Sequence, residues 1–577
     1  NLDFTTVALA TTDQMLDTPT NNFCTLNPVE PNWGGAVTLS DGNLALAGAS
    51  GTVWNNAVAT FKTLPSTGKW IWASEPNTSG AGRGDPWIVN ETGLASRNNY
   101  VYIDANGWET NFDSASVKAS LNNGAAITTS HSYGAGDLNV VCFDADTKKV
   151  WFGLFDVSAS ELKFQNSSGG LTGDPAAGTN QTYTLTGNEF SIGFATFTGR
   201  SGVVDFGQSN LLSQFTAPTD FKTLCTANLA TPSITDGSAY MQTLAYASTG
   251  TSTAFVQDGN SQFEPGLVWE KSRTGANNHL WFDQVRGATK FIRSDTTNAE
   301  NTVADTLTSF NSNGFTAGAD SVNWGINYPG RNNVAWMWKA NGAGSSNEDG
   351  ATTSTVSASA TSGFSIVKWT GTGANTTLGH GLGVAPQMIL VKNLADADSW
   401  VVYHEDVGAT KGLTLDTTAT PYTASTFFNN TAPTSSVFSI GSGGRTNGSS
   451  DGMIAYCFAE IPGYSSFGGY TGNGSTNGPF VYTGFKPAFV ILKRTNAVGG
   501  WFTYDSKRDP ENALTKVLQP DSSAAEVDSI DRLDFLSNGF KLRTSSANNN
   551  ASGGTFIYMA FAENPFGGDG VAPATAR

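Results

Sequence analysis

Charged side chains are scarce in this sequence, and most of them are acidic. Only 14% of the 577 residues are Asp, Glu, Lys or Arg, and the formal net charge is −17. Long amphipathic helices need Glu and Lys in volume, so the composition argues against an all-helical fold. A protein that binds duplex nucleic acid needs a basic surface to displace the counterions of the phosphates, so nucleic acid is not expected as a partner.

Cysteine and histidine are equally scarce, with four of each. The cysteines show no CxxC spacing and the histidines are scattered, so the sequence predicts neither a zinc site nor a disulfide framework. No apolar run approaches the roughly 18 residues of a membrane-spanning helix, and we expect no membrane insertion. The chain begins at Asn without a secretory signal, and we expect it to be trimmed, processed or part of something longer.

Glycine and aromatic residues are abundant instead. The chain holds 65 Gly, and 11% of its residues are Phe, Trp or Tyr, which supplies enough apolar area for real cores and argues against disorder. Short alternating apolar runs such as residues 364–369 and 488–493 are bounded by Gly, Asn, Thr and Pro clusters. This pattern predicts an all-β protein made of many short strands. Residues 511–518 are the best candidate for one or two helical turns.

Three segments of the chain repeat the same landmarks. Each begins with a strand that follows a proline and ends in lysine, continues to an aromatic–polar pair, and closes with an apolar strand (334–338, 454–458, 557–561). The distance from proline to aromatic is 17 residues in every copy, from 265 to 282, from 386 to 403 and from 487 to 504. The pairs are Phe282-Asp283, Tyr403-His404 and Tyr504-Asp505. Strand alternation predicts that each aromatic faces the core and its polar neighbour faces outward.

These landmarks give one plus three domains. We expect a β-sandwich over residues 1–230, followed by related β-sandwich repeats over 231–350, 351–460 and 461–577, in an elongated chain. The low-complexity stretch 340–362 fits either a flexible linker or an entry strand of the second repeat, and the sequence leaves both open.

The N-terminal unit resembles a SPRY domain, which has a concanavalin-like β-sandwich fold. The resemblance is carried by residues 33–35 (Trp-Gly-Gly), 66–72 (Ser-Thr-Gly-Lys-Trp-Ile-Trp) and 141–153 (Val-Cys-Phe-Asp-Ala-Asp-Thr-Lys-Lys-Val-Trp-Phe-Gly). In SPRY domains the last of these is a hairpin with an Asp-rich turn. Segments 190–194 and 204–208 look like the final strands.

Nearly the whole chain also resembles a group of phage tail proteins found notably in marine phages. The phrases that carry this resemblance are residues 16–28 (Leu-Asp-Thr-Pro-Thr-Asn-Asn-Phe-Cys-Thr-Leu-Asn-Pro), 215–224 and 371–386. The resemblance implies a virion fibre or receptor-binding protein, usually a homotrimer. In such proteins a laminin-G-like sandwich often precedes the Leu-Asp-Thr-Pro-Thr phrase.

The sequence offers aromatic side chains as the best ligand candidates. Sugars stack their apolar faces on Trp and Tyr rings, and Trp54, Trp87, Trp108 and Trp324 stand in Gly- and Asn-rich, loop-like contexts. Packing beneath a loop is the competing interpretation of each. The turn that contains Asp144 and Asp146 is a weak candidate for calcium; its competing interpretation is a hairpin in which Asp bonds its own backbone.

No catalytic motif accompanies these candidates, and no cofactor is expected apart from the weak calcium site. Adjacent carboxylates such as Glu405 and Asp406 rarely supply the separated pair that glycoside hydrolysis needs. The resemblance to phage tail proteins implies a virion tail appendage, extracellular, and the lack of a catalytic motif predicts that it is not an enzyme. Its expected partners are a host cell-surface glycan or outer-membrane receptor, copies of itself and other tail proteins. The alternatives are a structural virion protein (head decoration or tail spacer), a bacterial secreted adhesin or surface filament subunit, and a capsule depolymerase.

Overall fold

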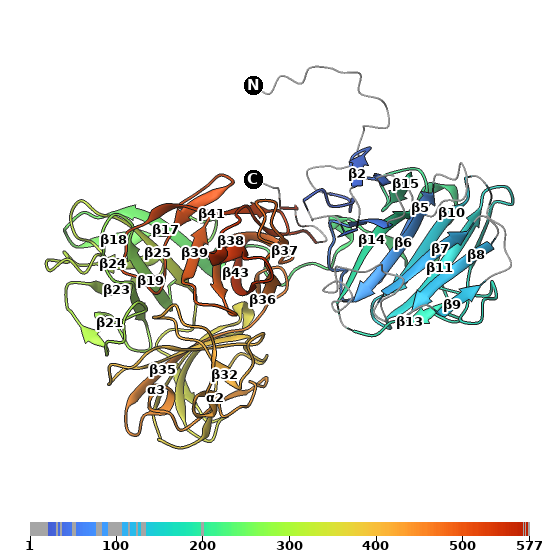
Figure 1. The fold of residues 1–577 in the computed structure, drawn as a ribbon. Coiled ribbons are helices and arrows are strands. Elements are labelled where there is room, and N and C mark those ends of the chain that lie inside the picture. The colour runs from blue at the N-terminus through green and yellow to red at the C-terminus, as the bar shows by residue number, and fades with distance from the viewer. Residues whose placement is uncertain are drawn as a thin grey trace, which may run out of the picture. The chain divides into compact units, whose positions relative to one another are not determined.

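The computed structural model describes residues 21–29, 33–34, 37–48, 54–76, 84–90, 107–113, 116–122, 125–128, 134, 136–187, 189–197, 201–568, 571 and 573–574. Almost all of its regular structure is β-strand, which confirms the predicted fold class (Figure 1). The chain divides into two compact units, residues 1–231 with 567–573 (unit 1) and residues 232–566 with 574–577 (unit 2). No helix in the described part of the chain is long and apolar enough to cross a membrane.

Unit 1 consists of two sheets whose strands pair almost entirely antiparallel. The first sheet has the order β1 (Trp33–Gly34), β4 (Trp54–Val58), β14 (Phe190–Phe197), β6 (Gly84–Asn90), β7 (Gly107–Asp113), β8 (Ser116–Asn122), β9 (Ala125–Thr128). The second has the order β12 (Glu161–Phe164), β11 (Lys149–Asp156), β10 (Leu138–Asp144), β5 (Lys69–Pro76), β15 (Ser201–Asp205), β3 (Ala45–Gly48), β2 (Val37–Ser40), with β13 (Tyr183–Thr184) on β11 and β16 (Lys222–Thr223) parallel to β5.

The two sheets of unit 1 pack face to face through aromatic side chains. Phe143 of β10 meets Phe190 of β14 at a ring-centroid distance of 5.4 Å. Strands β10 and β11 form the hairpin that the sequence predicted over residues 141–153. Unit 1 is therefore a β-sandwich, as expected from its alternating strands.

Unit 2 holds the three repeats, each built around a central sheet with further strands packed on it. Repeat 1 has a six-stranded sheet, β17 (Met241–Ala247), β25 (Asn332–Trp338), β19 (Leu267–Ser272), β20 (Leu280–Asp283), β21 (Lys290–Arg293), β22 (Asn301–Thr302), and a three-stranded sheet, β18 (Thr253–Val256), β24 (Gly314–Ala317), β23 (Leu307–Asn311).

Repeat 2 has the same plan. Its six-stranded sheet runs β26 (Ser345–Asn347), β27 (Ser354–Ser359), β28 (Phe364–Thr370), β35 (Gly452–Phe458), β30 (Met388–Asn393), β31 (Val401–His404). The strand pairs β29 (Thr376–Gly379) with β34 (Val437–Ile440) and β32 (Lys411–Gly412) with β33 (Tyr422–Thr423) complete it, together with the short helices α2 (Ser425–Phe428) and α3 (Gly444–Asn447). The stretch 340–362 is thus an entry to repeat 2 through β26 and β27 and not a linker.

Repeat 3 pairs two four-stranded sheets. They are β36 (Ser465–Thr471), β43 (Thr555–Pro565), β38 (Phe485–Arg494), β39 (Trp501–Asp505), and β37 (Phe480–Tyr482), β42 (Gly539–Leu542), β41 (Val527–Leu536), β40 (Leu514–Val517), with the single-turn helix α4 (Ala547–Asn550). Strand β40 occupies the stretch for which the sequence predicted helical turns, because Leu514 and Val517 are buried against the sheet.

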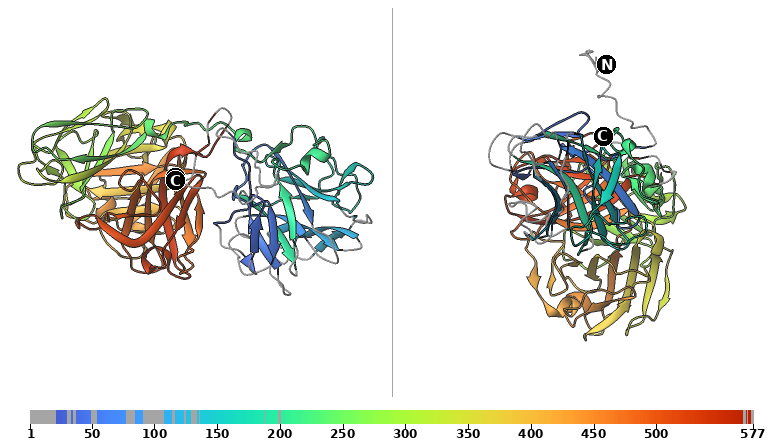
Figure 2. Two further views of the ribbon diagram at one scale, coloured as in Figure 1. Left: turned by 90° about the horizontal axis from the view of Figure 1, so that it is seen from above. Right: turned by 90° about the vertical axis from the view of Figure 1, so that its right-hand side faces the viewer.

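The three repeats do not follow one another in a line within unit 2; they close around a shared core. In repeats 1 and 2 the two faces of the central strand separate two cores: Trp269 of β19 points into the shared core, while its neighbour Val268 points into the core of repeat 1 alone. Trp338, Phe458 and Phe561, which end the three repeat units, meet at centroid distances of 5.7 to 6.0 Å. Figures 1 and 2 show the three repeats in green, yellow to orange, and red. The repeats of unit 2 pack together in this way because each central sheet is apolar on both faces and must bury both.

Candidate functional site

The four tryptophans proposed as ligand platforms lie in different environments. Trp54 and Trp108 belong to β4 and β7, but their side chains lie outside the described residues. Trp87 of β6 is fully buried, contrary to the expectation of an exposed loop residue. A Cβ on Gly193 of the neighbouring strand would lie only 2.3 Å from the Trp87 ring, so this glycine makes room for the indole. Trp87 is therefore a core residue.

Trp324 is partly exposed, on the loop between β24 and β25 of repeat 1. Its ring packs at 4.9 Å on Phe291, and the guanidinium of Arg293 lies 5.7 Å from its centroid. Asp320 holds the loop in shape, since its carboxylate accepts hydrogen bonds from the backbone N–H groups of Trp324 (2.7 Å) and Gly325 (2.8 Å). An indole supported on one side by the core and flanked by polar groups is the arrangement that a sugar-binding platform needs.

The polar setting of Trp324 comes from a second loop, between β19 and β20. Asn277 donates a hydrogen bond of 2.8 Å to the backbone carbonyl of Asn323, which ties the two loops together. Val322, next in the loop, is 67% exposed. The surface around Trp324 therefore offers an aromatic ring, an amide, a guanidinium and apolar contact within one end of repeat 1.

The carboxylates of the calcium candidates Asp144 and Asp146 are engaged in hydrogen bonds with nearby backbone N–H groups. Asp144 Oδ1 accepts the backbone N–H groups of Asp146 (3.1 Å) and Thr147 (3.2 Å), and Asp146 Oδ2 accepts that of Gly68 (3.2 Å). These are the turn contacts of the competing interpretation. Within the described ranges, no group of three His, Cys, Asp or Glu side chains is placed to hold a metal ion.

Buried polar side chains concentrate at the junctions between repeats. The predicted outward-facing neighbours Asp283, His404 and Asp505 are at most 1% exposed. Their aromatic partners face the core of their own repeat, as strand alternation predicts. The face of each strand that carries Asp283, His404 or Asp505 does not reach solvent, however, because it packs against the next repeat.

The junction of repeats 1 and 2 buries an aspartate–arginine pair. Arg286 Nε donates to Asp283 Oδ2 at 2.5 Å, and Tyr456 of repeat 2 donates its hydroxyl proton to the same oxygen at 2.7 Å. Glu300 adds a further ion pair to Arg286 at 3.3 Å. Burial is the largest single influence and lowers the pKa of Arg286, but Asp283, Tyr456 and Glu300 together outweigh it and raise the pKa of the guanidinium.

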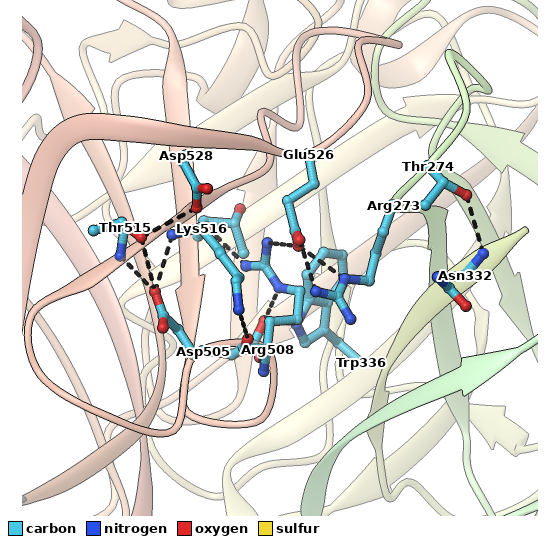
Figure 3. Close-up of polar contacts among 12 residues, drawn as sticks. Arg273, Thr274, Asn332, Trp336, Asp505, Arg508, Thr515, Lys516, Glu526 and Asp528 are labelled. Atoms are coloured by element: carbon cyan, nitrogen blue, oxygen red, sulfur yellow. Dashed lines mark hydrogen bonds and ion pairs between the residues drawn. The ribbon is translucent and has the colours of Figure 1, made fainter.

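The junction of repeats 3 and 1 repeats this pattern and extends it (Figure 3). Arg508 Nε donates to Asp505 Oδ2 at 2.5 Å, and Trp336 of repeat 1 donates its indole N–H to the same carboxylate at 3.0 Å. Glu526 accepts from Arg508 at 3.1 Å and from both Nε (2.9 Å) and Nη2 (2.7 Å) of Arg273 in repeat 1. This bidentate pair raises the pKa of Arg273, chiefly through its hydrogen bonds to Glu526.

The junction of repeats 2 and 3 is different, because it holds a histidine. His404 lies within 3.2 Å of the backbone carbonyl of Tyr558, and Val407 stands where the other junctions have arginine. Burial lowers the pKa of His404, an effect that Asp406 and the Tyr558 carbonyl only partly oppose.

The lysine that ends each repeated strand is also buried. Lys271, Lys392 and Lys493 each donate to backbone carbonyls, for example Lys493 to Gly499 at 2.5 Å. Burial lowers the pKa of all three ammonium groups to about 8. Their recurrence at one position in three copies was visible in the sequence and could have indicated burial.

Comparison with protein families identifies a family for unit 2. The family model described as "Domain of unknown function (DUF7483)" matches residues 236–565. No curated protein sequence matches the chain.

Among solved structures, the PSpry domain of TRIM65 is 13% identical (32% of this chain, 92% of that chain, TM-score 0.24). The SPRY domain of human HERC1 is 10% identical (34% and 100%, TM-score 0.20). A winged bean acidic lectin, solved with methyl-alpha-D-galactose, is 10% identical (32% and 96%, TM-score 0.23). TM-scores this low carry no information on what this chain binds.

Proposed function

Because the chain belongs to the DUF7483 family, whose description states no activity, we propose its function from the site itself: it binds glycans without chemistry, through the loops around Trp324. The partly exposed indole on a loop fixed by Asp320 is the observation that carries this proposal. The guanidinium of Arg293 beside it supplies a charged group for sugar hydroxyls, and Asn277 holds the loop in place through its bond to Asn323.

The setting that we propose is a virion tail appendage that contacts a bacterial surface. The support for this part is the resemblance of residues 16–28, 215–224 and 371–386 to phage tail proteins. Copies of the chain on one particle then bind together, so each site needs only millimolar affinity, about −4 kcal/mol.

The test is a glycan array and a titration with host polysaccharide, using the wild-type chain and Trp324→Ala. We expect at least a tenfold loss of affinity in the variant, since stacking on the ring is removed. Val498→Ala, at an exposed position of repeat 3, is the control and retains binding. Equal binding by all three proteins would refute the role of Trp324, and oligosaccharide released from the polysaccharide would refute binding without chemistry.

A structural virion role is the second candidate, and the charge network of the closed repeats favours it. The pair Arg273–Glu526 joins residues 253 positions apart and ties repeat 3 to repeat 1, as a part that must hold one arrangement would require. An array without hits, together with labelling of this chain on the particle away from the tail tip, is the result that supports the structural role over receptor binding.

A further inference from the structure

Repeat 2 carries an exposed aromatic ring of its own, Tyr422 of β33. The ring packs edge to face on the buried Phe427, at a centroid distance of 5.4 Å. Arg445 of α3 donates a hydrogen bond of 2.8 Å from Nη1 to the Tyr422 hydroxyl oxygen. The ring is therefore supported by a core residue and fixed at its hydroxyl by a guanidinium, while part of its surface stays open to solvent.

Tyr422 lies over the strand pair of repeat 2 that corresponds to the pair beneath Trp324 in repeat 1. Gly412 and Phe291 both stand 26 residues after the proline that opens their repeat, from 386 to 412 and from 265 to 291. Gly412 is the cross-strand neighbour of Tyr422, and Phe291 is the cross-strand neighbour of Asn301. Phe291 packs on the Trp324 ring at 4.9 Å. The exposed rings of the two repeats thus lie at equivalent places in the fold.

The loop before the last central strand of each repeat supplies another part of this surface. A buried asparagine anchors the loop in every copy, because its Oδ1 accepts a backbone N–H of an earlier turn at 2.8 Å; the three are Asn327, Asn447 and Asn550. Trp324 stands three residues before Asn327, and Arg445 stands two residues before Asn447. Equivalent turns therefore place a ring in repeat 1 and a guanidinium in repeat 2.

Two repeats thus combine a solvent-accessible ring, a buried ring that supports it and a guanidinium beside it. The members are Trp324, Phe291 and Arg293 in repeat 1, and Tyr422, Phe427 and Arg445 in repeat 2. Gly412 permits the second set, because a Cβ at that position would lie only 2.5 Å from the Phe427 ring. The same composition is reached from different positions of the chain.

Repeat 3 has no such set at this place. Val527 holds the position of Tyr422, since it pairs with Val517 as Tyr422 pairs with Gly412. The turn that corresponds to α3 is α4, whose sequence is Ala-Asn-Asn-Asn, with neither a ring nor a guanidinium. The fold therefore does not require the set, and its presence in repeats 1 and 2 calls for a cause other than folding.

The guanidinium groups of both sets form no ion pair within the described residues. Arg445 donates one hydrogen bond, to Tyr422, and Arg293 donates one, to Asn301. The chain has 48 acidic residues against 31 basic ones, so carboxylates are not scarce. A guanidinium presents its N–H donors in a fork that matches a carboxylate. Both groups therefore keep donors for an acidic ligand.

We propose that Tyr422 and Arg445 form a second ligand site, and that both sites take a sugar ring that bears a carboxylate, as uronic acids do. This inference rests on the proposed glycan-binding function and names its ligand class. The apolar face of the sugar stacks on the solvent-accessible ring, and the carboxylate accepts charge-assisted hydrogen bonds from the guanidinium. Two sites on one chain also add to the avidity of the particle.

The experiment uses the full chain and oligosaccharides of glucuronic, galacturonic, mannuronic and guluronic acid, each with its carboxyl-reduced counterpart. Saturation-transfer NMR follows binding. Trp324→Ala and Tyr422→Ala each keep part of the wild-type signal, and the double variant keeps none. In the Trp324→Ala chain, Arg445→Gln weakens binding of the acidic sugar at least about tenfold. Val527→Ala changes the position equivalent to Tyr422 in repeat 3 and keeps the full signal.

The outcomes separate this inference from the proposed function. Loss of the whole signal in Trp324→Ala overturns the second site and leaves the proposed function in place. An unchanged signal in Trp324→Ala with complete loss in Tyr422→Ala supports the second site and refutes the role of Trp324. Equal binding of the carboxyl-reduced sugars, or no binding of any acidic one to the wild-type chain, overturns the assigned ligand class.

Discussion

The three junctions of unit 2 occupy equivalent positions, yet two of them bury a charge pair and one does not. Asp283–Arg286 and Asp505–Arg508 join repeats 1 to 2 and 3 to 1, while His404 and Val407 stand at the same places between repeats 2 and 3. Only the junction of repeats 3 and 1 adds Arg273, whose bond to Glu526 spans 253 residues. That junction joins segments that are not successive in the chain, and a backbone hydrogen bond from Glu526 N–H to the Arg273 carbonyl (2.8 Å) joins the side-chain contacts in holding it.

The difference teaches that the repeated backbone tolerates either solution, provided every buried group finds a partner. A buried ion pair replaced by a well-packed neutral group is often no less stable, whereas half of a pair is costly. The junctions are therefore expected to differ less in the stability that each contributes than in the stability that is lost when one buried partner is removed.

The largest effect is expected from Arg508→Met. The change leaves the fully buried Asp505 carboxylate without its cation, and we expect a loss of about 3–5 kcal/mol in the free energy of unfolding. The matched change Val407→Met, at the neutral junction, costs less than about 1.5 kcal/mol. Urea denaturation followed by tryptophan fluorescence measures both, and equal losses would contradict the comparison.

An intermediate effect is expected at the histidine junction when the pH falls. Because the pKa of His404 is lower in the folded chain than its usual value near 6.5, its contribution is complete above pH 6.5 and is lost as the pH decreases below it. The wild-type chain then loses up to about 2 kcal/mol by pH 5 relative to His404→Gln. Melting curves from pH 7.5 to pH 5 measure the difference; parallel curves for the two proteins would show that His404 does not titrate in this way.

The smallest effect is expected from the exposed ion pair at the junction of repeats 3 and 1. Lys507 and Asp258 lie 2.6 Å apart, but their side chains are 41% and 47% exposed. Lys507→Ala should cost less than about 1 kcal/mol, and 0.5 M NaCl should remove that cost. A loss comparable to that of Arg508→Met would show that burial is not what separates the two pairs.

Much of the fold could be predicted from the sequence, since strand alternation and the spacing of proline, lysine and aromatic residues are local signals. The all-β class, the hairpin near Asp144 and the core position of Phe282, Tyr403 and Tyr504 followed from them. The closing of the repeats could not be predicted, because period-two alternation says that Asp283 leaves its own core but not whether water or another repeat receives it. Among the site candidates, Trp87 and Trp324 have similar loop-like sequence contexts; Trp87 is buried beside Gly193, which is distant in sequence and lies on the paired strand, so its burial could not be predicted locally.

The closure of repeat 3 on repeat 1 also sets the order in which this protein can mature during synthesis. Trp269 and Trp338 pack against Phe489 and Phe561, residues that leave the ribosome more than 200 positions later. Until then, the apolar surface of the first two repeats that packs against repeat 3 is exposed to solvent. A nascent chain of this kind folds late and is exposed to aggregation, so its yield depends on how quickly translation delivers the last hundred or so residues.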